Sequence, residues 1–215
     1  MNINTDSLTD QFVNLILEMI INKKLLPGEQ IPTKEIAQNY GVSVMPVRQA
    51  LRELTEKKLV VNKARVGYFV ASYTPEELIQ ISSCRRMFET YCLEHYFTSL
   101  DLNLLHELYE RIQDNIGENF DNLQFQKDDA ALHSSFVKAS KNPYLLDHYK
   151  QIEDLFYLCI TYDDDMRDNY LSRAEHLRLL EYIFAGKKEA ALLELKTHLN
   201  RVDKTIQAIG QDQIG

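Results

Sequence analysis

Residues 26–70 read LPGEQIPTKEIAQNYGVSVMPVRQALRELTEKKLVVNKARVGYFV, and this stretch decides the fold of the chain. The Pro-Gly pair near its start marks a turn. Thr33 is placed to cap a short helix, and Gly41 supplies the left-handed backbone that a tight corner needs. Ser43 is placed to cap a second helix with Pro46 in its first turn, where the missing N–H of proline costs nothing. Two helices joined by a tight corner predict a helix-turn-helix.

Two short strands complete this pattern. They are expected at residues 59–61 and 68–70, with a basic turn between them. On the preceding helix, Arg48 and Arg52 are expected to point outward. Together these elements predict a winged helix-turn-helix, whose second helix enters the major groove of DNA.

Charge separates the chain into two parts. Residues 1–73 carry nine Lys and Arg against seven Asp and Glu, a net charge of +2, whereas residues 74–215 carry fifteen against twenty-five, a net charge of −10. All nine basic residues of the first part lie between Lys23 and Arg65. An acidic protein with one basic module is suited to place that module on a polyanion. The alternative, a small helical subdomain whose charges only solvate a face, does not explain this asymmetry.

Residues 27–60, together with VGYFV at residues 66–70, resemble the DNA-binding domain of the GntR family of bacterial transcription regulators. The resemblance implies that the helix starting at Ser43 is the recognition helix and that the wing reaches the minor groove. Where the family often has arginine, this chain has Val44, which can contact only a thymine methyl group or a sugar. The positions that the resemblance assigns to DNA contact are occupied by Lys34, Ser43, Val44, Arg48, Arg65 and Gly67.

The second part of the chain is expected to be entirely helical. Thr74 as N-cap and Pro75 at the first helical position open a new helix, so we predict domains at residues 1–73 and 74–215. The fold class predicted is mainly α, with an N-terminal winged helix-turn-helix and a C-terminal antiparallel bundle of six helices. The expected helices span residues 75–98, 101–117, 121–140, 143–162, 169–185 and 187–208.

Four polar side chains fall where this bundle should have its core. Asp129 and His133 are spaced i,i+4, which places both on one face of a helix, where they can grip one metal ion. His176 and His198 each lie among leucines of later helices. Taken singly, each of these histidines fits a satisfied core position better than a ligand position.

As a set, these residues resemble a known arrangement. DDAALHSSFVKASKNPYL (residues 128–145) and AEHLRLLEYIFAGKKEAALLELKTHL (residues 174–199) are similar to the FCD effector domain of the FadR-type branch of the GntR family. The resemblance implies an effector-binding and dimerisation domain with one divalent metal ion. Three nitrogens and one carboxylate suit Zn²⁺, Ni²⁺ or Mn²⁺. The implied metal ligands are Asp129, His133, His176 and His198.

Arg85 has two interpretations. The resemblance implies that it points into a ligand cavity, where its fork suits a carboxylate effector. A five- or six-coordinate ion held by four protein ligands keeps one or two positions open, which a carboxylate or hydroxycarboxylate can occupy. In the alternative interpretation Arg85 pairs with Glu89, at i,i+4, on the helix surface.

Composition limits the location of the protein. It has no apolar run long enough to cross a membrane and no secretory signal. Its three cysteines form no CxxC pair and are expected to be buried and reduced. We therefore expect a cytoplasmic protein.

The leading interpretation is a transcriptional regulator, expected to be a repressor and not an enzyme. It would bind double-stranded operator DNA as a homodimer, under control of a small carboxylate metabolite bound at the divalent metal. One alternative is a metal-dependent, hydrolase-like enzyme, for which no general base is identified. Another is a regulator whose metal is itself sensed or is purely structural.

Overall fold

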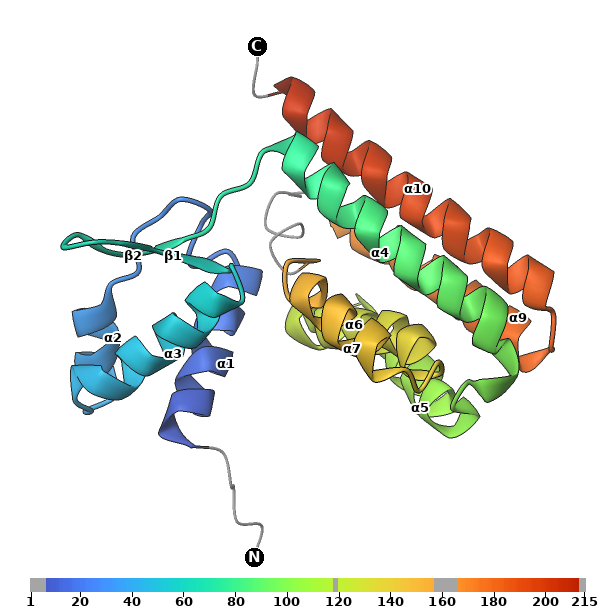
Figure 1. Ribbon diagram of the computed structural model, residues 1–215, viewed down its shortest axis with the longest axis horizontal. Helices are drawn as coiled ribbons and strands as arrows, with labels where there is room; N and C mark the ends of the chain where they lie inside the picture. Colours follow the sequence, from blue (N-terminus) through green and yellow to red (C-terminus); the bar gives the residue numbers. More distant parts are fainter. Residues whose placement is uncertain (1–6, 118–119, 157–165, 213–215) are drawn as a thin grey trace, which may run out of the picture. The chain divides into compact units, whose positions relative to one another are not determined.

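In the computed structural model, residues 7–117, 120–156 and 166–212 are described (Figure 1). The chain divides into two compact units, Met1–Tyr73 and Thr74–Gly215. Across the described residues, no helix is long and apolar enough to cross a membrane.

The N-terminal unit is a three-helix domain with a two-stranded wing. The strands are antiparallel, with Val60 opposite Val70 and Lys63 opposite Gly67. This arrangement confirms the predicted winged helix-turn-helix. Its elements are α1 (Leu8–Ile21), α2 (Thr33–Asn39), α3 (Val44–Glu56), β1 (Val60–Lys63) and β2 (Gly67–Val70).

Local chemistry explains most of these boundaries. Gly41 has φ +65° at the corner between α2 and α3, a conformation that glycine adopts without steric cost. Ser43 is the N-cap of α3 in an extended conformation. The prediction for Thr33 is wrong: α2 begins at Thr33 itself, its N-cap is Pro32, and the Thr33 hydroxyl donates to the carbonyl of Ile31. A residue that is already helical cannot serve as N-cap.

The C-terminal unit is all-helical within its described residues. The N-caps Thr74, Asp101, Asp121 and Asn142 each accept a backbone N–H of the first turn, so these four expected helix starts are confirmed. The helix expected from residue 169 begins earlier, at Met166. The helix expected at 143–162 ends earlier, at Glu153, and residues 157–162 lie outside the described part. The helices are α4 (Pro75–Tyr96), η1 (Phe97–Ser99), α5 (Leu102–Asp114), α6 (Asn122–Lys138), α7 (Pro143–Glu153), α9 (Met166–Phe184) and α10 (Lys188–Asp212).

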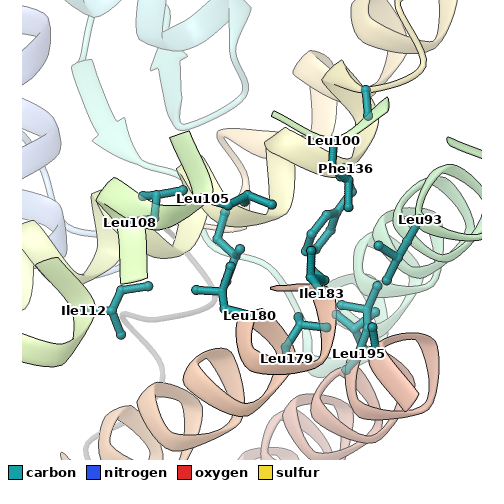
Figure 2. Packing of buried hydrophobic residues seen from close by; sticks show 14 residues of the cluster. Leu93, Leu100, Leu105, Leu108, Ile112, Phe136, Leu179, Leu180, Ile183 and Leu195 are labelled. Carbon is teal, nitrogen blue, oxygen red and sulfur yellow. The ribbon is translucent and has the colours of Figure 1, made fainter. Parts of the chain in front are cut away.

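The described part of the bundle contains a large apolar cluster and a group of buried polar side chains. Helices α4 and α10 lie side by side and run antiparallel (Figure 1). Ser82 of α4 bonds Asp203 of α10, and Arg86, one turn further along α4, also reaches Asn200, about one turn earlier in α10. Buried apolar side chains of α4, α5, α6, α9 and α10 pack together at one end of the bundle, and Figure 2 shows this cluster. Its labelled members are Leu93, Leu100, Leu105, Leu108, Ile112, Phe136, Leu179, Leu180, Ile183 and Leu195.

The cysteines only partly follow expectation. Cys92 is buried, but Cys84 is exposed on α4. Cys159 lies outside the described residues.

Candidate functional site

Three helices bring the four polar side chains of the bundle core together. Asp129 and His133 come from α6, His176 from α9 and His198 from α10. One ligand atom of each lies within 4.8 Å of those of the others. The Nε2 atom of His176 is 3.3 Å from that of His133, 3.4 Å from that of His198, and 3.3 Å from Oδ1 of Asp129.

Two of the histidines are oriented by carboxylates behind them. Nδ1 of His133 is 2.5 Å from Oε2 of Glu89, and Nδ1 of His198 is 2.7 Å from Oε2 of Glu175. With Nδ1–H donating to a carboxylate, Nε2 carries a lone pair that faces the centre. Lone pairs and a carboxylate oxygen that converge on one point repel each other unless a cation lies between them.

The spacing of these atoms fits a metal ion. Two nitrogens bound tetrahedrally at about 2.0–2.1 Å are about 3.3–3.4 Å apart. The two Nε2–Nε2 distances, 3.3 and 3.4 Å, agree with this value. The residues present therefore fit a divalent ion of the kind that imidazole and carboxylate prefer.

The protonation states of these side chains also favour binding of a cation. Burial lowers the pKa of His133 and of His176 well below the usual value, so these imidazoles are neutral near pH 7. Among the described residues, Nδ1 of His176 has no hydrogen-bond partner. For Asp129, burial acts to raise the pKa, but His133 and Arg85 outweigh it and lower the pKa to about 2. The centre thus presents the neutral imidazoles of His133 and His176 and the ionised carboxylate of Asp129.

Arg85 lies beside this centre. Its Nε donates to Oε1 of Glu89 at 2.6 Å, and one terminal nitrogen is 3.4 Å from Oδ2 of Asp129. Its guanidinium also lies 4.3 Å from the ring centre of Phe156. The pair with Glu89 therefore exists, but in the interior, because the side chains are 6% and 0% exposed. Burial acts to lower the pKa of Arg85, yet Glu89 and Asp129 raise it, so the group stays charged.

A small cavity adjoins the four candidate metal ligands. It has room for about one water molecule, so an acid of several atoms must displace some of its walls. Burial raises the pKa of Glu153 on one of these walls. The lining residues are Arg85, Gln126, Asp129, Ala130, His133, Tyr149, Glu153 and Phe156.

The residues expected to contact DNA gather around a groove of the N-terminal unit. Lys34 of α2, Arg48 of α3 and Arg65 of the wing are exposed and line it, together with Val44 and Gly67. Ser43 is exposed at the start of α3. The resemblance did not assign Gln30, Arg52, Asn62, Lys63 and Tyr68, which line the same groove.

Gly67 has a conformational reason for its place in the wing. Its φ is +142°, and a Cβ there would lie 2.9 Å from Nε2 of Gln30. That amide donates to the carbonyl of Val66 at 3.1 Å. Arg65, at the tip, has φ +64°. Gly67 thus shapes the wing that presents Arg65.

Three residues behind the candidate metal ligands were not predicted from the sequence as part of this site. Glu89 was considered only as a surface partner of Arg85, whereas Glu175 and Tyr149 were not considered. Tyr149 donates its hydroxyl to Oε1 of Glu89 at 2.8 Å. For Glu89 and Glu175 the sequence offers one signal: each is an acid within a helix that also carries apolar residues, and a buried acid needs partners.

The sequence matches the gntR family of bacterial regulatory proteins over residues 8–70 and the FCD domain over residues 80–201. It is 28% identical over 195 residues to the HTH-type transcriptional regulator YdhC of Bacillus subtilis, covering 88% of this chain and 87% of the relative. A GntR regulator from Rhodococcus sp. RHA1 has a similar fold, with a TM-score of 0.78, 21% identity, and coverage of 93% of this chain and 97% of that chain.

The Zn²⁺-bound FCD domain of TM0439 is 29% identical, with a TM-score of 0.56. That comparison covers 64% of this chain and 96% of that chain.

A winged helix-turn-helix joined to an all-helical FCD domain defines a ligand-responsive transcription regulator. The chain belongs to the gntR family, in the group of regulators that carry an FCD domain. It is a DNA-binding transcription regulator, because both of its domains are found in such regulators and its relatives are regulators.

Proposed function

We propose that this regulator is a repressor whose operator binding is controlled by a small carboxylate bound at a divalent metal ion. The ion would be held by Asp129, His133, His176 and His198. The observation that carries the proposal is the convergence of three imidazole nitrogens and one carboxylate oxygen, with two of the imidazoles oriented from behind. Zn²⁺, Ni²⁺ and Mn²⁺ are the ions that this ligand set favours.

The bound ion would supply a positive charge for a carboxylate oxygen. Arg85 supplies the second positive charge from the wall of the cavity. Its Nε is occupied by Glu89, so its terminal nitrogens are the donors for an acid. When a carboxylate lies between the ion and Arg85, each of its two oxygens faces a positive charge. The site therefore favours an acid over a neutral molecule of the same size.

The signal would reach DNA through α4. This helix carries Arg85 and begins at Pro75, five residues after β2 ends at Val70. An acid that draws Arg85 toward the centre would tilt α4 and shift the attached N-terminal unit. A homodimer on an operator needs a fixed separation of its two recognition helices, so a small shift lowers affinity. The DNA contacts proposed are those of Lys34, Ser43, Val44, Arg48, Arg65 and Gly67.

The test is operator affinity measured by fluorescence anisotropy, on a duplex selected in vitro from random sequence. Metal-loaded and metal-free protein are each titrated with acetate, D-gluconate and L-malate. We expect at least one acid to weaken DNA binding of the loaded protein alone. A response to metal without any acid would indicate a metal sensor, and a chelator effect on folding alone would indicate a structural ion. Turnover of an ester or amide by the loaded protein would support the hydrolase-like alternative.

A further inference from the structure

Two ligand histidines have the same arrangement behind them. Each Nδ1 bonds one oxygen of a glutamate, and that glutamate bonds an arginine. In one case the arginine lies one turn away on the same helix, and in the other it lies on a neighbouring helix. For His133 the glutamate is Glu89, which accepts from Nε of Arg85 at 2.6 Å. For His198 the glutamate is Glu175, which accepts from Nε of Arg201 at 2.8 Å.

The two chains of contacts end in different places. A terminal nitrogen of Arg201 donates to the hydroxyl of Ser172 at 2.6 Å, and its side chain is 20% exposed. This chain ties α9 to α10, and none of its outer members lines the cavity beside the ligands. Arg85, by contrast, is almost fully buried and forms part of the cavity wall.

Glu89 shares its two oxygens among three partners. Oε2 contacts Nδ1 of His133, whereas Oε1 accepts from both Nε of Arg85 and the hydroxyl of Tyr149. Its side chain is 0% exposed, so no water competes for these bonds. One rigid carboxylate therefore fixes the orientation of a metal ligand and of the cavity arginine together.

We propose that Glu89 is a positioning residue with two roles, metal retention through His133 and recognition of the acid through Arg85. Glu175 has only the first role, through His198. This inference rests on the proposed function, because it assigns duties within the same metal and acid site. The same change, Glu to Gln, should therefore weaken recognition of the acid at Glu89 but not at Glu175.

The test compares Glu89→Gln with Glu175→Gln, using Co²⁺ as the metal probe. Gln keeps the size of the side chain but removes its charge. Competition with a coloured chelator measures metal affinity, and the d–d absorption of bound Co²⁺ reports the geometry of its ligands. We expect both variants to lose roughly 10- to 100-fold in metal affinity, which is the usual effect of changing an outer partner of a ligand.

The second measurement uses acetate, the simplest carboxylate, on protein kept saturated with Co²⁺. The change in d–d absorption gives its apparent affinity. We expect wild type and Glu175→Gln to respond alike, and Glu89→Gln to need about tenfold more acetate, since a charged hydrogen bond that holds Arg85 is lost.

The matched control is a substitution that removes a contact between α4 and α10 away from the site. Asp203 of α10 bonds Ser82 and Arg86 of α4 and touches no ligand histidine. Asp203→Asn should lower the unfolding temperature while leaving Co²⁺ affinity, spectrum and acetate response unchanged. Should Glu89→Gln fail to fold, Glu89→Asp keeps the charge but is too short to reach both His133 and Arg85, and the same loss of acetate response is expected.

The possible results separate cleanly. Equal acetate responses in the two glutamate variants would overturn the second role of Glu89. Metal affinities equal to wild type in both variants would overturn positioning altogether and leave the proposed function standing. A wild-type protein that binds no Co²⁺ would refute the proposed function and this inference with it.

Discussion

The groove of the N-terminal unit and the centre of the C-terminal bundle hold their functional side chains in opposite ways. In the groove, Lys34, Arg48 and Arg65 are exposed, and their placement follows from helix ends, a left-handed glycine and a wing turn. In the bundle centre, His133 and His176 are 0% exposed, and the contact between them joins two residues that are 43 positions apart in sequence. An exposed site is fixed by local geometry, whereas a buried one is fixed by partners distant in the chain.

The strongest test of this contrast removes buried ligands. The His176→Ala, His198→Ala double variant should lose its metal, because two of four ligands are gone. The loss of affinity should exceed the roughly 10- to 100-fold expected from outer partners. Elemental analysis after dialysis measures it. His95→Ala is the control, since His95 is exposed and its ring bonds the carbonyl of Tyr91. Full metal content in the double variant would refute the assigned ligands.

The corresponding test at the exposed site is Arg48→Ala. Its side chain should contribute about 1–3 kcal/mol per subunit through a base contact in the major groove. Specific operator affinity should therefore fall steeply, while unfolding temperature and metal content stay unchanged because no buried contact is lost. Arg65→Ala should weaken binding evenly across sequences and reduce its dependence on salt. A footprint and affinity like those of wild type would show that α3 does not read the bases.

The contrast also explains what the sequence could predict. Gly41 and Thr74 act on neighbours within a few residues, so the corner of the helix-turn-helix and the start of α4 could be read directly, whereas Ser43 takes the N-cap position of α3 without a capping bond from its side chain. The spacing of Asp129 and His133 predicted a shared helix face. That His176 and His198 meet them depends on how three helices pack, and only the family resemblance pointed to it.

Arg85 illustrates the same limit. Its spacing from Glu89 predicted the pair, but α4 carries polar and apolar residues on all sides, so periodicity could not distinguish a buried pair from an exposed one. Tyr149 reaches Glu89 from sixty residues away, and no local signal could announce that bond.

Coupling between the two sites gives a smaller effect. An acid that weakens operator binding of the wild type should do so by roughly 5- to 150-fold, the usual range of allosteric coupling. Arg85→Met, which keeps the bulk of the side chain without its charge, should largely abolish this response while metal content is retained. Anisotropy titrations of both proteins at saturating metal decide the matter. An equal shift in wild type and variant would exclude Arg85 from the route.

The smallest effect is expected at Thr74, where an exposed local device supports the helix that carries the buried arginine. The Thr74 hydroxyl accepts the backbone N–H of Glu77 at 3.2 Å, and the Glu77 carboxylate accepts the N–H of Thr74 at 2.8 Å. Thr74→Ala removes half of this capping box and should destabilise α4 by about 0.5–2 kcal/mol. Calorimetry should then show that the unfolding temperature of the C-terminal unit is lower by a few degrees. Metal affinity should not change, because Arg85 and Glu89 lie in the third and fourth turns of α4, beyond the reach of a frayed first turn. Thr74→Ser keeps the capping oxygen and should behave as wild type. Weaker metal binding in Thr74→Ala alone would mean that the centre depends on the helix end as well as on its buried partners, and the contrast between the two sites would then fail.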